Sequence, residues 1–345
     1  MNSIEPNELF TTPSGDPIID VRTPAEFAAG NMPGSINIPL FTNNERAEVG
    51  TLYKQENKRN ALLRALDIVG PKMSDLVKQA SKIKYNEKLI VQCWRGGMRS
   101  ESVAWLLNTA GIPTVKVFGG YKGFRRYAAS VINRKWKFKV ITGCTGSGKT
   151  EVLLKLKEMG KQVVDLEGIA DHKGSVFGGM GHSPQPTTEQ FENNLFWAIK
   201  DFDINRTVWV EDESACIGHV YVPQEFYKRM HFSPLVKLEL SIDNRIERLV
   251  NEYAQFDNDQ LTCAIDKITK RLGGSNARLA VEAIKNGDYH KTTQILLSYY
   301  DKAYNHSVEE RRSQIEFEKA YEHFNAEAMA KDILEALKTN NPSQL

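Results

Sequence analysis

The segment Gly143-Cys-Thr-Gly-Ser-Gly-Lys-Thr150 constrains this chain more than any other feature. It fits the pattern GxxxxGK[ST], follows the apolar run WKFKVITG at 136–143 and precedes the helical pattern EVLLKLKEMG. Glycines at these positions let consecutive backbone N–H groups turn toward one anion, while the helix start adds its dipole. The segment therefore predicts a loop that holds a diphosphate-like group in an α/β domain. The residues expected to bind the phosphates are Gly143, Gly146, Ser147, Gly148, Lys149 and Thr150.

A second apolar run ends in carboxylates, as the Walker B strand of such domains does. Val208-Trp-Val210 leads directly into Glu211 and Asp212. We expect one of these carboxylates to support a magnesium ion, with Thr150 as a ligand, if the reaction uses magnesium. An acidic cap at the end of a strand is the alternative interpretation. The chain has no NKxD-type sequence to read guanine, which argues against a GTPase.

The segment 165–178 is dense in polar residues and glycines and follows a predicted strand, which indicates a binding loop beside the phosphate loop. An ordinary surface position explains His172 equally well. Arg271, in Arg-Leu-Gly-Gly, is a weaker candidate, and Tyr299, Tyr300 and Tyr304 are expected in a helical core rather than at a ligand. The candidates in the segment are Asp165, Glu167, His172, Lys173 and Ser175.

The segment Cys93-Trp-Arg-Gly-Gly-Met-Arg-Ser100 places a cysteine at the end of a predicted strand, in a glycine turn before a helix. Backbone N–H groups and the arginines at 95 and 99 favour the thiolate, which is the nucleophilic form of cysteine. A single buried cysteine is more often structural, but Arg95 and Arg99 around the turn favour function. The chain's other three cysteines form no CxxC pair, which argues against a zinc site.

The alternation of strand and helix patterns predicts two α/β domains, and 345 residues are enough for both. We expect a first domain over 1–134, ending in a basic junction helix, and a second over 135–345. No strand pattern occurs from about 243 to 310, so we expect helices there. The predicted strands are 17–21, 88–93, 114–118, 136–143, 162–166, 206–212, 234–242 and 314–318.

Charge is distributed unevenly, although the net charge is only +2. Residues 102–150 contain no Asp or Glu, and their nine Lys and Arg residues are mixed with Phe124, Tyr127, Trp136 and Phe138. This composition is typical of nucleic-acid contact with base stacking, and it is equally typical of a solvated helix with its aromatics in the core. No run of about 20 apolar residues and no signal-peptide pattern occurs, so we expect no membrane association and a cytoplasmic location.

The first domain resembles the rhodaneses. Asp20-Val-Arg22-Thr-Pro-Ala-Glu-Phe, the later Gly30-Asn-Met-Pro-Gly34, the cysteine loop 93–100 and Phe118-Gly-Gly-Tyr-Lys-Gly-Phe124 match that family's opening, active-site loop and closing segment. Asn31-Met32 stands where many rhodaneses have a histidine. The resemblance adds Asp20 and Arg22 to the candidate site residues.

The order of the domains and motifs along the chain points to a more specific family. A rhodanese-like domain followed by 143–150, the loop 165–178, the strand end at 211–214 and Arg271–Gly274 resembles the tRNA 2-selenouridine synthase family over about residues 10–310. The resemblance implies replacement of sulfur by selenium in 2-thiouridine at the tRNA wobble position. It implies two steps: S-geranylation from geranyl diphosphate, then substitution by selenium from selenophosphate.

The resemblance also implies roles for the residues. Cys93 would handle selenium, with a transient perselenide as one form, and Arg95 and Arg99 would bind selenophosphate. The phosphate loop would hold geranyl diphosphate, and the basic junction with the C-terminal helices would hold the anticodon arm. We expect no tightly bound cofactor. Two alternatives stay open: an ATP-dependent tRNA sulfurtransferase, and a nucleotide-sensing module with an inactive rhodanese domain.

Overall fold

The structure is a computed structural model that describes residues 2–11 and 15–340. Its described residues form two compact units, each with its own parallel sheet. The first unit comprises Met1–Ile132 together with Glu192–Lys200, and the second comprises Asn133–Phe191 together with Asp201–Leu345. The boundary near residue 132 lies close to the junction expected from the sequence, but that expectation did not include the return of 192–200 to the first unit.

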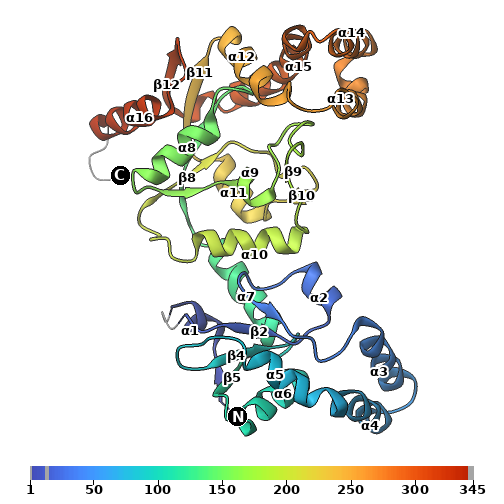
Figure 1. The fold of residues 1–345 in the computed structure, drawn as a ribbon. Helices are drawn as coiled ribbons and strands as arrows, with labels where there is room; N and C mark the ends of the chain where they lie inside the picture. Colours follow the sequence, from blue (N-terminus) through green and yellow to red (C-terminus); the bar gives the residue numbers. More distant parts are fainter. Residues whose placement is uncertain (1, 12–14, 341–345) are drawn as a thin grey trace. The chain divides into compact units, whose positions relative to one another are not determined.

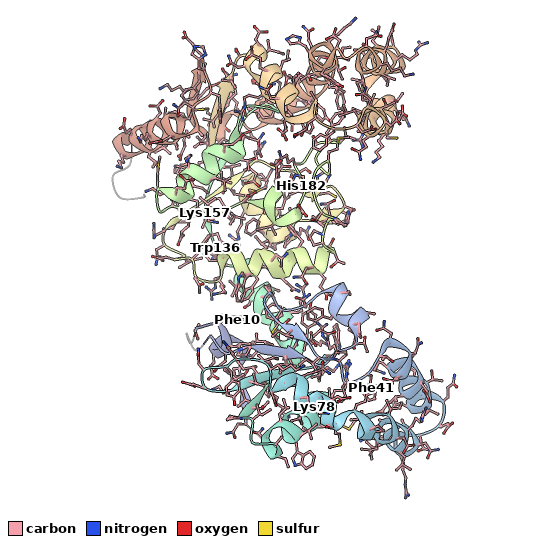
Figure 2. All side chains as sticks on the ribbon, in the orientation of Figure 1. Phe10, Phe41, Lys78, Trp136, Lys157 and His182 are labelled. Carbon is pink, nitrogen blue, oxygen red and sulfur yellow. The ribbon has the colours of Figure 1, made fainter. Side chains whose placement is uncertain are left out.

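The first unit is built on a five-stranded parallel sheet of order β1-β5-β4-β2-β3 (Figure 1). The central strand β4 is buried along its whole length, as its run Leu-Ile-Val-Gln predicts. Phe41, labelled in Figure 2, is buried in the hydrophobic core of this unit. The elements are β1 (Ser3–Ile4), α1 (Pro6–Thr11), β2 (Ile18–Asp20), α2 (Pro24–Ala29), β3 (Ile36–Asn37), α3 (Asn43–Gln55), α4 (Lys58–Val69), η1 (Gly70–Lys72), α5 (Met73–Ala80), β4 (Leu89–Gln92), α6 (Met98–Thr109), β5 (Thr114–Val117) and α7 (Gly120–Ile132).

Helix α2 begins at a side-chain cap formed by Thr23 and Glu26. The Thr23 side chain accepts a hydrogen bond from Glu26 N–H at 3.2 Å, and the Glu26 carboxylate accepts one from Thr23 N–H at 2.9 Å. This reciprocal capping box satisfies two N–H groups that would otherwise lack a partner, and Pro24 needs none. The cap holds the Glu26 side chain at the start of α2.

The second unit has a five-stranded parallel sheet of order β12-β11-β6-β8-β7, with a separate hairpin of β9 and β10. The central strand β6 leads directly into the phosphate loop, and helices α13, α14 and α15 pack together (Figure 1). Helix α10 (Thr188–Ile199) starts in this unit, but its residues from Glu192 onward belong to the first unit. The other elements are β6 (Lys137–Thr142), α8 (Lys149–Glu158), β7 (Gln162–Val164), α9 (Leu166–Ala170), β8 (Thr207–Glu211), β9 (Cys216–Ile217), β10 (Val220–Tyr221), α11 (Gln224–His231), β11 (Leu235–Leu240), α12 (Ile242–Tyr253), α13 (Asn258–Leu272), α14 (Gly274–Lys285), α15 (Tyr289–Glu310), η2 (Arg312–Gln314), β12 (Ile315–Tyr321) and α16 (Ala326–Asn340).

Each of the eight predicted strands is present within a residue or two at its start, and the region 243–310 is helical. The elements that the sequence did not predict are short or polar, such as β1, β3 and the β9–β10 hairpin, or lie in the stretch 43–80, whose helices have exposed apolar faces. Within the described part of the chain, none of the helices combines the length and the apolar character needed to cross a membrane.

Candidate functional site

Cys93 lies at the carboxyl end of β4 and is buried, with 3% of its surface exposed. Its Sγ is 3.2 Å from Ser100 Oγ and 3.9 Å from Gly97 O. The Ser100 hydroxyl donates to Gly97 O at 3.1 Å, so the thiol sits inside a loop closed by its own hydrogen bonds. The predicted placement, a cysteine opening a loop between strand and helix, is what the structure has.

Two glycines allow the closing segment to pack on this loop. Gly96 and Gly120 have φ of 69° and 58°, in the left-handed region that side chains disfavour. A Cβ at Gly120 would lie 2.2 Å from Cys93 O and 2.4 Å from Gly96 N. Tyr121 N–H donates to Cys93 O at 2.9 Å. The start of α7 therefore holds the cysteine loop by direct backbone contact.

The two arginines of the loop differ in their surroundings. Arg99 makes a bidentate ion pair with Glu26, at 2.7 and 3.1 Å, whereas Arg95 is exposed at the rim. Burial would raise the pKa of Glu26, but the hydrogen bonds from Arg99 and Thr23 N–H outweigh it and lower that pKa to about 2. Arg99 is thus positioned by α2, and Arg95 is the arginine open to an incoming anion.

Asp20 and Arg22 lie together in the core. Both are fully buried, and Arg22 Nη2 is 2.6 Å from Asp20 Oδ2 and 2.7 Å from Gly30 O. The Arg22 guanidinium also lies 3.8 Å from the centroid of the Tyr121 ring. Because Tyr121 is bonded to the cysteine loop, this pair ties β2 to the loop from inside the fold.

The phosphate loop runs from β6 into α8 as predicted. Gly146 and Gly148 have φ of 82°, Ser147 N–H donates to Cys144 O at 3.0 Å, and Lys149 Nζ donates to Gly143 O at 2.9 Å. Ser147 is 1% exposed, so it shapes the loop from inside. Burial and the nearby Asp301 carboxylate raise the pKa of the Cys144 thiol to about 11, so this cysteine is not a thiolate at neutral pH.

Two arginines of α12, which sequence reasoning missed, support this loop. Arg245 is 5% exposed, donates to Thr145 O at 3.2 Å and pairs with Asp301 of α15 at 2.6 and 2.8 Å. Arg248 donates to Gly146 O at 3.1 Å. Their spacing of three places both on one face of a helix that follows a strand, a signal that the sequence did contain.

The carboxylates at the end of β8 differ from expectation. Both oxygens of Asp212 are taken by Arg311, at 2.9 and 2.7 Å, and Thr142 Oγ1 donates to it at 2.6 Å. Asp212 is therefore neutralised by a cation from the end of α15. Glu211 is fully buried, its Oε1 accepts from Glu167 N–H at 2.8 Å, and its Oε2 has no partner among the described residues.

Two further glutamates, Glu211 and Glu213, interact with Glu167, which contacts Thr150. Thr150 Oγ1 donates to Glu167 Oε2 at 3.0 Å, and burial followed by the negative charge of Glu167 raises the pKa of Glu213 to about 8. Burial also raises the pKa of Glu211 well above its usual range. Hard oxygen donors of this kind suit magnesium, and the unpartnered Glu211 Oε2 fits such a site. No described group of three or more His, Cys, Asp or Glu residues has metal-site geometry.

The other candidates of the loop 165–178 have varied surroundings. Asp165 caps α9 by accepting from Gly168 N–H at 2.7 Å, and Lys173 pairs with Glu252. Burial lowers the pKa of His172, with the charges of His182 and His219 acting in the same direction. His182, shown in Figure 2, is itself 2.7 Å from Asp171. Of the predicted set, Glu167 contacts Thr150 of the phosphate loop, and Ser175 lines the pocket described next.

A pocket of about 540 Å³, open solvent included, has the phosphate loop as part of its wall. Thr145 of the loop and Ser175 line it, and the rest of its wall comes from Phe177 and helices α12 to α15. Tyr300, which we expected in a helical core, lines this pocket. The lining residues are Thr145, Ser175, Phe177, Leu249, Val250, Tyr253, Ala254, Leu261, Ile284, Tyr289, Thr292, Thr293, Leu296, Leu297 and Tyr300.

The hydroxyl groups around this pocket are largely used by the protein itself. Thr292 Oγ1 donates to Ala280 O at 3.2 Å and Thr293 Oγ1 to Tyr289 O at 2.8 Å, so both threonines can turn their methyl groups to the pocket. Tyr300 Oη accepts from Val176 N–H at 3.2 Å. None of the described lining residues carries a charge or an amide. The pocket is therefore suited to an apolar group.

The aromatic residues of the basic segment are in the core. Phe124, Trp136 and Phe138 are at most 5% exposed, and Phe124 packs at 5.4 Å from Phe196 of the segment 192–200. Of the two interpretations left open by the sequence, aromatics in the core is the one that holds for these three rings, and the half-buried Tyr127 packs against Phe10 and Phe196. The exposed cations of the segment are Lys122, Arg126, Arg134, Lys135 and Lys137. Arg271 is exposed at the end of α13 and does not line the pocket.

The fold and these sites define a class: a rhodanese-like domain with a loop cysteine, followed by a phosphate-loop α/β domain. The rhodanese-like domain family matches residues 7–127, and the family described as the tRNA 2-selenouridine synthase AAA domain matches residues 136–333. The chain belongs to the tRNA 2-selenouridine synthase family.

Curated relatives resemble the chain over most of its length. A tRNA 2-selenouridine synthase of Shewanella sediminis is 33% identical, with 90% of this chain and 92% of the relative covered. One from Nitrosomonas eutropha is 36% identical over 73% of this chain and 66% of its own length. One from Shewanella oneidensis is 33% identical over 88% of this chain and 89% of its own.

Proposed function

We propose that the protein is an enzyme that replaces sulfur by selenium in 2-thiouridine at the wobble position of tRNA. Two steps make up the reaction: S-geranylation from geranyl diphosphate, then substitution by selenium from selenophosphate. Membership of the family supports the modification of tRNA. Because its tRNA substrate is cytoplasmic, the cytoplasmic location expected from the sequence is part of this proposal.

The observation that carries the geranyl step is the apolar pocket that shares a wall with the phosphate loop. An allylic diphosphate has an anionic head and a hydrocarbon tail, and Thr145 belongs both to the loop and to the pocket wall. The loop N–H groups and Lys149 suit the head. A wall of aliphatic and aromatic groups suits the tail, because burying hydrocarbon contributes about 25 cal/mol per Å².

The chemistry of the first step agrees with these groups. The thiocarbonyl sulfur forms a bond to C1 of the geranyl group, the C1–O bond breaks, and diphosphate leaves with the electron pair. The base loses its N3 proton as C2–N3 becomes a double bond. Lys149 stabilises the charge that develops on the leaving group. Magnesium, if used, would be held by Thr150, Glu167 and Glu211 and would add further positive charge there.

The second step belongs to the cysteine loop. Alkylation converts the sulfur into a good leaving group, so the selenium of selenophosphate can form a bond to C2 while the C2–S bond breaks and geranylthiol leaves with a proton. Water takes the phosphoryl group as the P–Se bond breaks, which releases phosphate. Cys93 would handle selenium, and the exposed Arg95 would attract the selenophosphate anion. Arg99 would act through its pair with Glu26, which fixes the start of α2 beside the loop.

The pocket also bears on the two alternatives. A nucleotide base is usually recognised by hydrogen bonds, and the described lining offers no charged or amide group for that purpose. This observation favours a prenyl diphosphate over ATP. A nucleotide-sensing module would not need a loop cysteine held by backbone contacts to α7.

Mass spectrometry of nucleosides tests the proposal. Transfer RNA that contains 2-thiouridine is incubated with the protein and geranyl diphosphate, with and without selenophosphate. We expect a geranylated nucleoside without selenophosphate and a selenonucleoside with it. If folded protein leaves 2-thiouridine unchanged in both reactions, the proposal is wrong, and ATP-dependent sulfur transfer is tested next by following ATP consumption.

A further inference from the structure

The apolar pocket has a direction, which two contacts at the phosphate loop define. Arg245 donates to Thr145 O and pairs with Asp301, so the part of α15 near residue 301 lies at the phosphate loop. Leu249 lies 3.1 Å from the position of a Cβ on Gly146, and Leu297 packs with it. One end of the pocket is therefore at the phosphate loop, and its wall follows α15 from there toward the first residue of that helix.

The positions of the lining residues along α15 give the depth of the pocket. The wall residues run from Tyr300 through Leu297 and Thr293 to Tyr289, which is eleven residues or about 16 Å along a helix that rises 1.5 Å per residue. Tyr289 is at the far end. Leu261 and Ile284, from α13 and α14, belong to the core cluster that Tyr289 packs against.

The Tyr289 ring is fixed in place. Its hydroxyl donates to Asn258 Oδ1 at 2.9 Å, so it joins the first turn of α15 to the first turn of α13. The backbone carbonyl of Tyr289 accepts from Thr293 Oγ1 at 2.8 Å. A ring held at both its hydroxyl and its backbone moves aside less easily than a free side chain.

The length of a prenyl chain can be compared with this depth. With C–C bonds of about 1.5 Å, each extended isoprene unit adds about 5 Å. A geranyl chain that starts at the phosphate loop would then span about 10 Å and end near Thr293, whereas the third unit of a farnesyl chain would reach the Tyr289 ring. We infer that Tyr289 sets the upper limit of prenyl length in this enzyme, so that geranyl is accepted and farnesyl is excluded. This inference rests on the proposed function.

The test compares geranyl and farnesyl diphosphates as donors to tRNA that contains 2-thiouridine, with nucleosides quantified by mass spectrometry. We expect Tyr289→Ala to raise the farnesyl-to-geranyl ratio of kcat/KM by about tenfold or more, since a cavity then opens at the end of the pocket. Tyr289→Phe keeps the ring but loses its hydrogen bond to Asn258, so it is the matched control, and we expect its ratio to rise less than that of Tyr289→Ala. An unchanged ratio in Tyr289→Ala that still transfers geranyl would overturn the inference and leave the proposed function intact.

A second variant shortens the pocket instead. Thr293→Trp fills the level at which a geranyl chain ends, so we expect transfer from dimethylallyl diphosphate to persist while geranyl transfer falls about tenfold. Equal loss with both donors in a folded variant would count against the assigned direction of the pocket. No transfer from any prenyl diphosphate by the wild-type protein would instead contradict the proposed function.

Discussion

At the scale of single residues, Cys93 and Cys144 both lie in glycine-containing loops, but the surroundings of their thiols differ. The thiol of Cys144 is held protonated at neutral pH by burial and by Asp301, so only the backbone of that residue contributes to its loop. Cys93 lies in a loop held by α7 and bordered by two arginines. We therefore propose Cys93, and not Cys144, as the nucleophile.

Replacing Cys93 should separate the two steps. In Cys93→Ser we expect geranylation to continue and the selenonucleoside to disappear, so that the geranylated nucleoside accumulates when both donors are present. Mass spectrometry of the nucleosides measures both products in one sample. Cys263→Ser, an exposed position on α13, is the control and should leave both products unchanged. Selenation by Cys93→Ser at the wild-type rate would contradict the role of this thiol.

Lys149 should matter for the leaving group. Removing a charge that stabilises the transition state costs about 10²- to 10³-fold in kcat, so we expect that loss of geranyl transfer in Lys149→Ala. Lys157, exposed on the same helix, provides the matched control, with Lys157→Ala near wild type (Figure 2). Initial rates of geranylation give the comparison. A loss of less than about threefold would show that the phosphate loop does not act in this step.

At the scale of elements, Glu26 connects helix α2 to the cysteine loop through its ion pair with Arg99. Its pKa of about 2 lies below the ordinary value of 4.5, so its ion pair with Arg99 stabilises the fold fully above about pH 4.5. That contribution is lost as the pH falls toward 2. Glu26→Gln should therefore lower the free energy of unfolding by about 1 to 3 kcal/mol at pH 7 and by little near pH 2.

Urea unfolding followed by circular dichroism from pH 7 down to pH 3 measures this difference. Glu87→Gln, at an exposed carboxylate, is the control and should change the unfolding midpoint little at any pH. A Glu26→Gln penalty that stays constant across the whole range would mean that the carboxylate charge does not stabilise this region.

Sequence reasoning found the elements whose pattern is local. The buried runs of β4, β6 and β8 and the caps of α2 are encoded within a few residues, so they could be predicted. The Arg311–Asp212 pair spans 99 residues and the Arg245–Asp301 pair spans 56, and neither spacing carries a local signal. For the same reason the apolar pocket could not be predicted, because four helices build it and each looks like an ordinary amphipathic helix.

At the scale of the whole molecule, tRNA binding should depend on exposed cations rather than on aromatic stacking in the basic segment. Arg134 and Lys135 are exposed, whereas Trp136 beside them is buried. In Arg134→Ala/Lys135→Ala we expect weaker tRNA binding and a smaller dependence of binding on salt. The slope of log K against log salt should become less steep by roughly 0.7 to 0.9 for each phosphate contact that is lost. Filter binding at several salt concentrations gives both values.

The matched control for this variant removes two exposed lysines elsewhere. Lys78→Ala/Lys82→Ala has the same change in net charge but lies on and just after α5, outside the acid-free segment 102–150. It should bind tRNA nearly as the wild type does. Equal weakening in both double variants would indicate that net charge alone, and not this segment, determines tRNA affinity.

The central claim is that the phosphate loop and the apolar pocket bind one ligand, an allylic diphosphate. Calorimetric titration of the protein with geranyl diphosphate, inorganic diphosphate and ATP tests this claim directly. We expect geranyl diphosphate to bind at least tenfold more tightly than inorganic diphosphate, with a more negative heat-capacity change, because its chain is buried in the pocket. Equal affinity for the two diphosphates, or a preference for ATP, would contradict the claim.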